Sequence, residues 1–257
     1  MAEVKINDNP DEFSPEELES EERALEVSNK NVALAKPGEV RFTGHLKKPY
    51  LQIAHGVGGL SQAGFSPGEM VVDKTVVVYS PPKPVKGTVS AADPAIVTIV
   101  SVSDYWKEVT QFGAPDLPRT WQTEGLAIAD GMVTQYPPFG SGLPLPTARP
   151  ALNIDLLVRE PDGVEDRGVF LFRLGDKYWA PARMICDKAQ YNEVISPLTK
   201  AMYTHGASGI YSATWEFRTR NKLVKSTGNF VWVPDIKLAK TKTPQEIEEL
   251  KKVLGNL

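Results

Sequence analysis

The chain has 257 residues, of which 41% are hydrophobic and 24% are charged, values that exclude a wholly disordered protein. No apolar run approaches the roughly 20 residues of a membrane-spanning helix, and the acidic N-terminus lacks the apolar segment of a secretory signal. The single cysteine, Cys186, can form neither an internal disulfide nor a thiolate zinc site alone. We therefore expect a cytoplasmic protein, in a cell or an infected cell.

The charge is unevenly distributed. Residues 1–30 carry ten acidic and three basic side chains, a net charge of −7, within a chain whose 29 basic and 32 acidic residues give −3 overall. Residues 31–257 therefore carry +4. A basic body with an acidic segment hints at a polyanionic partner, although such a segment can equally serve solubility alone. We interpret residues 1–36 as an acidic, flexible arm and residues 37–257 as one β-rich domain.

The first half of this domain has the texture of a β protein. Residues 46–54 predict a short strand, and the valine-rich residues 70–79 and 95–106 predict two longer strands. The proline-rich residues 81–87 separate the longer two as a loop, because proline cannot donate to a strand ladder. Residues 112–150 are rich in proline and glycine and predict a long irregular loop.

The second half predicts a meander, two helices and a hairpin. Strands at 151–158, at 167–174 and from 178 are joined by turns that contain Gly and Asp. Residues 187–204 predict a helix that Pro197 kinks or divides, with Gly206 as its stop. A long hairpin follows at 211–236, and the capping box that begins at Thr243 opens a C-terminal helix ending near Leu254. We expect a mainly β (α+β) fold, a twisted antiparallel barrel or sandwich with two or three helices.

Most catalytic signatures are absent from the sequence. It contains no Walker loop, no G-x-S-x-G elbow and no His-Glu-x-x-His motif. The three histidines, His45, His55 and His205, lie in unrelated contexts, and Cys186 is more simply a buried structural thiol than a nucleophile. We expect no enzymatic activity, no metal and no cofactor.

Aromatic residues alternate with basic residues on several predicted strands. Single-stranded nucleic acid requires cations that follow its phosphates and flat rings on which unpaired bases stack. This combination makes single-stranded DNA the expected partner. The predicted binding residues are Lys47, Lys48, Tyr50, Tyr105, Trp106, Lys107, Tyr178, Trp179, Arg218, Arg220, Lys222 and Lys225.

Each of these residues also has a purely structural explanation. Alternation predicts that Trp215 and Phe217 face the core, and the charged face beside them is typical of a solvated strand or a protected edge. Adjacent strand residues point to opposite faces, so one aromatic residue of each pair can lie in the core while the other is exposed. The pairs are Tyr105 with Trp106, and Tyr178 with Trp179.

Four short motifs carry a resemblance to a known family: the segment 48–54, the turn 66–69, the Tyr105-Trp106 strand end and the segment 229–234 in the last hairpin. In this order they resemble phage-encoded single-stranded DNA-binding proteins of the OB-fold type. The resemblance implies an OB-like barrel that coats DNA in replication or recombination in the host cytoplasm. Such proteins often carry an acidic C-terminal tail that recruits partners. Here the acidic segment is N-terminal, and it would contact replication or recombination proteins instead.

An alternative from another class is a virion structural or assembly protein. The proline-rich residues 137–146 and the acidic arm would then serve contacts between subunits. Assembly without DNA would distinguish this alternative from DNA binding.

Overall fold

The computed structural model describes residues 48–82, 92–110, 117–138, 140–163, 168–224 and 228–255. The chain divides into two units, Lys47–Lys251 and residues 1–46 with 252–257, and the fold below belongs to Lys47–Lys251 apart from the last turn of the C-terminal helix. The predicted acidic arm, residues 1–36, lies outside the described residues. No helix in these ranges is long and apolar enough to cross a membrane.

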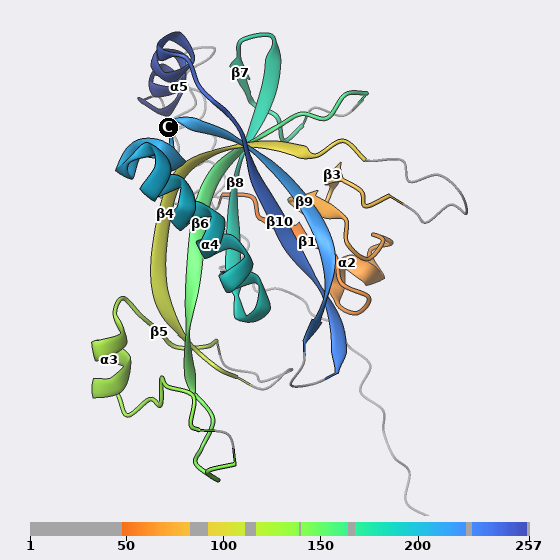
Figure 1. Ribbon diagram of the computed structural model, residues 1–257. Coiled ribbons are helices and arrows are strands. Elements are labelled where there is room, and N and C mark those ends of the chain that lie inside the picture. Colours follow the sequence, from red (N-terminus) through yellow and green to blue (C-terminus); the bar gives the residue numbers. More distant parts are fainter. Residues whose placement is uncertain are drawn as a thin grey trace, which may run out of the picture. The chain divides into compact units, whose positions relative to one another are not determined.

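A large antiparallel sheet dominates the fold. Its central strands are β4 (Ala95–Glu108), β6 (Ala148–Arg159) and β8 (Lys177–Asp187), which lie side by side in Figure 1. The strand order is β10-β9-β4-β6-β8-β7, and β5 pairs with β4. A second sheet has the order β1-β2-β3. The expected mainly β, α+β fold is confirmed, but the described strands close no barrel.

The predicted strand at 70–79 is a hairpin. β1 (Leu51–Ile53) pairs with β2 (Met70–Val72), and β2 turns back into β3 (Val76–Tyr79). The two turn residues, Asp73 and Lys74, have φ angles of 50° and 57°. Positive φ at both central positions is characteristic of the tight turn that joins antiparallel strands. The valine pattern predicted the strands but gave no sign of this turn.

The predicted meander has the wrong strand order. β6 pairs with β8 along nine residue pairs, whereas β7 (Phe172–Leu174) pairs with β8 along three. β8 therefore lies between the two strands that precede it in the chain. Apolar residues recur along the whole of β6 and β8, and each paired row of the two strands buries side chains. The stabilisation from this long pairing outweighs the fact that β7 is the nearer strand to β6 in the sequence. The turn at Gly175 between β7 and β8 is confirmed.

The predicted loop at 112–150 contains regular structure. β5 (Thr120–Trp121) pairs with β4, and α3 (Glu124–Ala129) follows at once. The Thr123 hydroxyl accepts a hydrogen bond from the backbone of Leu126 and caps this helix. Trp121, Ala127 and Ala148 bury a small satellite core of their own. We call residues 117–147 the excursion.

Helix α4 (Lys188–His205) covers one face of the central strands (Figure 1). It buries Val194, Leu198 and Ala201 in one apolar cluster with side chains of β6 and β8. Pro197 lies inside this single helix, which is not divided there, and Gly206 follows it as predicted. Met202, one residue after Ala201, is exposed.

The last hairpin and the C-terminal helix agree with the sequence. β9 (Ala213–Val224) pairs with β10 (Asn229–Thr241), and Trp215 and Phe217 are buried as expected. α5 (Pro244–Gly255) begins with the predicted capping box, in which Glu246 N donates to Thr243 Oγ1 and Thr243 N donates to Glu246 Oε2. With the one-turn helix α2 (Gly59–Gln62) the described residues contain four α-helices, more than predicted, besides a 3₁₀ turn at Ala207–Ile210.

Candidate nucleic-acid interface

The face of the sheet opposite α4 carries polar and aromatic side chains. Residues that lie opposite one another in an antiparallel pair share a face, and the register aligns Ser103 with Asn153 and Asn153 with Ile185. The neighbouring row aligns Tyr105 with Ala151. Ile154 and Met184, one residue away along their strands, point to the core beneath α4. The face that carries Ser103, Asn153 and Tyr105 is therefore accessible, whereas α4 covers the other face.

A hollow of about 740 Å³ lies on this accessible face. We call it the sheet-face groove. Its lining includes three aromatic residues, Tyr50, Tyr105 and Trp121, together with one cation, Arg183, and one anion, Asp104. Tyr105 is half-buried, and this burial raises the pKa of its phenol, which is neutral near pH 7.

Tyr50 enters the groove because its backbone is attached to β8. Tyr50 and Arg183 form an isolated parallel bridge, and Arg183 N donates to Pro49 O at 2.7 Å. The Tyr50 side chain remains 42% exposed. An exposed ring on a fixed backbone offers a flat surface for stacking at a small entropic cost.

Asp155 holds two cations at the edge of the groove. Its carboxylate accepts from Lys48 Nζ at 2.9 Å, from Arg183 Nε at 2.8 Å and from Ser101 Oγ at 3.2 Å. Burial opposes ionisation of this carboxyl, but the hydrogen bonds from Arg183 and Lys48 outweigh it and hold its pKa below the usual value. Both cations are therefore balanced, in part, by one anion.

A smaller hollow of about 270 Å³ adjoins the strand ends. Three basic residues line it, Lys107, Arg149 and Lys188, together with two acidic residues, Glu108 and Asp187. Lys107 Nζ donates to the Asp187 carboxylate at 2.8 Å. Asp187 is the N-cap residue of α4, but its side chain caps no backbone group in the helix. The strand ends thus carry more positive than negative side chains.

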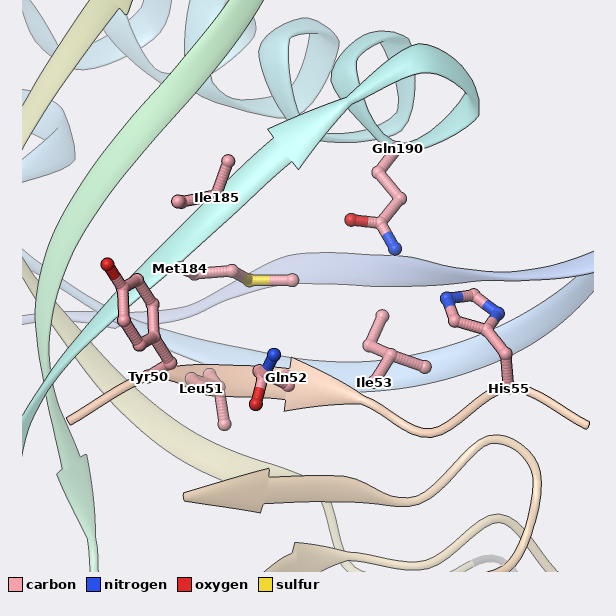
Figure 2. Close-up of a pocket in the computed structure, with 8 residues that line it drawn as sticks. All are labelled: Tyr50, Leu51, Gln52, Ile53, His55, Met184, Ile185 and Gln190. Atoms are coloured by element: carbon pink, nitrogen blue, oxygen red, sulfur yellow. The ribbon is translucent and has the colours of Figure 1, made fainter. Parts of the chain in front are cut away.

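A third hollow opens beyond Tyr50 (Figure 2). This β1–β8 cleft has a volume of about 360 Å³. Tyr50 and Ile185 line both the cleft and the sheet-face groove. The two hollows are therefore neighbours that share a rim.

The structure brings four of the predicted binding residues to this face: Lys48 and Tyr50 before β1, and Tyr105 and Lys107 on β4. Other predicted residues lie elsewhere. Trp106 packs against the satellite core, and Tyr178 packs against the main core. Trp179 is only 7% exposed. A base could not stack on Trp179, because its ring is packed in the interior of the protein.

The basic residues of β9 serve another contact. Arg220 and Lys222 both donate to the Glu193 carboxylate of α4, and Arg218 lies 3.8 Å from Glu216. A carboxylate of α4 therefore neutralises outward-facing charges of β9. The sequence alone does not show that α4 contacts this strand. Lys47 and Lys225, also predicted to bind, lie outside the described residues.

Sequence reasoning missed several residues that line these hollows. Trp121 and Arg149 belong to the stretch predicted as an irregular loop and to its edge, so neither was placed on a strand. Arg183 is separated from other basic residues in the sequence and reaches the groove only through the register of β8 with β6. Its alternation with the core residues Ala182 and Met184 along β8 was the available signal.

Comparison with protein-family models, curated proteins and solved structures finds no match. Among the residues that the structure describes, no group of three or more His, Cys, Asp or Glu side chains could hold a metal ion.

Proposed function

We propose that this protein binds single-stranded DNA in the sheet-face groove and does not act as an enzyme. The supporting observation is the row of accessible rings and cations across β4, β6 and β8, with Tyr50 and Tyr105 in one hollow and Lys107 and Arg149 beside the next. Bases would stack on the tyrosines while phosphates meet the basic side chains. An OB-like use of the curved sheet, and a coating role in replication or recombination in the cytoplasm, belong to this proposal.

The ion pairs of these cations would weaken the binding of DNA. Lys48, Arg183 and Lys107 each contact a carboxylate, so a phosphate must compete with Asp155 or Asp187 for them. Competition of this kind lowers affinity and makes release easier, which suits a protein that must leave DNA after coating it. A duplex would bind poorly, because its bases are stacked inside and cannot reach rings within a hollow.

Replacing the central ring tests this proposal. We expect Tyr105→Leu to weaken binding of a fluorescent DNA strand by about 1–3 kcal/mol, the contribution of one stacked base, which is roughly fivefold or more in the dissociation constant. The salt dependence should not change, because no phosphate contact is removed.

The matched control is Tyr203→Leu. Tyr203 is 88% exposed and lies on α4, on the other side of the sheet. Its replacement should leave binding unchanged. Equal losses in the two variants, or no loss in either, would contradict a stacking site at Tyr105.

The exposed apolar side chains of the excursion favour a second candidate, the virion structural or assembly protein. Six large apolar residues are exposed in the described part of the excursion: Leu117, Leu126, Ile128, Tyr136, Leu143 and Leu145. Concentrated exposed apolar surface is typical of protein contacts. Sedimentation without DNA distinguishes the two functions, because concentration-dependent shells or rings would support assembly and a constant small species would oppose it.

A further inference from the structure

The β1–β8 cleft exists because the chain leaves the edge of β8 after Tyr50, the residue that precedes β1. Within the described ranges, Tyr50 and Arg183 form the one bridge between this segment and β8. From Leu51 onward the segment pairs with β2 instead, beginning with Val72. The edges of β1 and β8 then separate, and the cleft fills the space between them (Figure 2).

The lining of the cleft combines an apolar floor with polar groups that carry no net charge. Ile53 and Met184 are buried in its floor, and the exposed Tyr50 and Ile185 form its rim. The polar groups come from three places in the fold. Gln52 lies on β1, His55 follows β1, and Gln190 projects from the first turn of α4 (Figure 2). Among the residues that the structure describes, no Lys, Arg, Asp or Glu side chain lines the cleft.

These three side chains can each both donate and accept. An amide carries both functions, and so does a neutral imidazole. Burial lowers the pKa of His55 below its ordinary value and favours the neutral ring. The Gln52 Oε1 atom is buried and has no hydrogen-bond partner among the described residues. No protein contact through this oxygen fixes the amide, so it can turn either its oxygen or its nitrogen toward a ligand.

We propose that the β1–β8 cleft accepts one unstacked adenine base of the bound strand. This inference rests on the proposed DNA binding and adds a base preference to it. A flat, uncharged ring with donors and acceptors on its edge matches the lining, whereas a phosphate would find no cation there. A glutamine side chain can recognise adenine by two hydrogen bonds, to the N6 and N7 atoms of the base. A peptide strand fits less well, because the Tyr50–Arg183 bridge closes one end of the gap.

The test compares two labelled oligonucleotides by fluorescence anisotropy. One is an oligothymidylate of about 15 nucleotides, within the range that small binding domains cover, and the other has one central adenine. The strand can slide, so the adenine can reach the cleft. We expect the wild type to bind the adenine-containing strand about fivefold more tightly, the lower range for one two-point contact. Replacement of that adenine by 7-deazaadenine, which lacks the N7 acceptor, should remove most of the preference.

Gln190→Leu should abolish this preference while leaving the affinity for oligothymidylate and its salt dependence unchanged. The matched control is Gln245→Leu, an exposed glutamine in the first turn of α5, which should keep the preference. Equal binding of both strands by the wild type, or a preference that survives in Gln190→Leu, would overturn the adenine pocket alone. Failure of the wild type to bind either strand would overturn the proposed function and the pocket together.

Discussion

At the edge of the sheet-face groove, Asp155 competes with any phosphate for Lys48 and Arg183. Asp155→Asn keeps the shape of the side chain and removes its charge. We expect this variant to bind single-stranded DNA more tightly, and its salt dependence to steepen by up to about one unit for each cation that gains a phosphate. Anisotropy titrations at several salt concentrations would measure both effects.

Asp176→Asn serves as the control for this change. Asp176 is exposed in the turn between β7 and β8, away from the Asp155 ion pairs. Its replacement by Asn removes the same charge from the molecule as Asp155→Asn does. If both variants gained affinity equally, net charge alone would explain the result. Unchanged or weaker binding by Asp155→Asn would show that Lys48 and Arg183 do not meet phosphate.

The sequence predicted the division of one aromatic pair but not of the other. Tyr105 lies in the groove and Trp106 packs in the satellite core, as strand alternation requires. Tyr178 and Trp179 also alternate, yet both pack against protein, because their end of β8 is covered on both faces. Alternation predicts which neighbours point apart, whereas burial depends on what lies beyond each face.

Among the elements, the β2–β3 turn places a lysine in the left-handed region. At φ 57°, Lys74 adopts a conformation that glycine reaches freely and β-branched residues avoid. We expect Lys74→Gly to have a higher free energy of unfolding than Lys74→Val, by about 1–2 kcal/mol. Urea denaturation of both variants would measure the difference.

The same two substitutions at Lys237 provide the comparison. Lys237 is an exposed residue in the middle of β10, where valine is favoured and glycine weakens the strand. The order of stability should therefore reverse. If valine were the more stable residue at both positions, the turn at Lys74 would differ from the one described.

Local signals predicted the elements that depend on local interactions. Helix α4, the β9–β10 hairpin and the capped α5 follow from periodicity, a turn and a capping box within a few residues. The pairing of β6 with β8 across β7 could not be predicted in this way. It depends on which long strands bury the most apolar surface together, a property of the assembled sheet.

For the whole molecule, charge asymmetry leads to a further prediction. Removing residues 1–30 changes the net charge from −3 to +4. We expect the shortened protein to bind single-stranded DNA more tightly at low salt, by about threefold or more, with the difference shrinking as salt screens the charges. Titrations of both proteins at low and high salt would measure this.

A full-length variant in which seven of the ten arm acids are replaced by Asn or Gln carries the same net charge as the shortened protein, +4, and so separates charge from length. It should behave like the shortened protein if charge is responsible. Equal affinities of the wild type and both altered proteins would remove any role of the acidic segment in DNA binding.

Some of the residues proposed to bind DNA lie together in the structure, whereas others lie elsewhere. The sequence indicated rings and cations on strands, and Tyr50 and Tyr105 do share a hollow. It could not indicate that Glu193 of α4 engages Arg220 and Lys222, because that contact joins elements far apart in the chain. Distant partners decide which exposed charges stay available to a ligand.

The most direct test of the central claim is a titration of a labelled DNA strand of about 30 nucleotides, beside the matching duplex, at about 50 and 200 mM salt. The account predicts submicromolar binding of the single strand, weakened by salt, with quenching of protein fluorescence and much weaker binding of the duplex. Absence of binding at the lower salt concentration, or equal binding of strand and duplex, would contradict it.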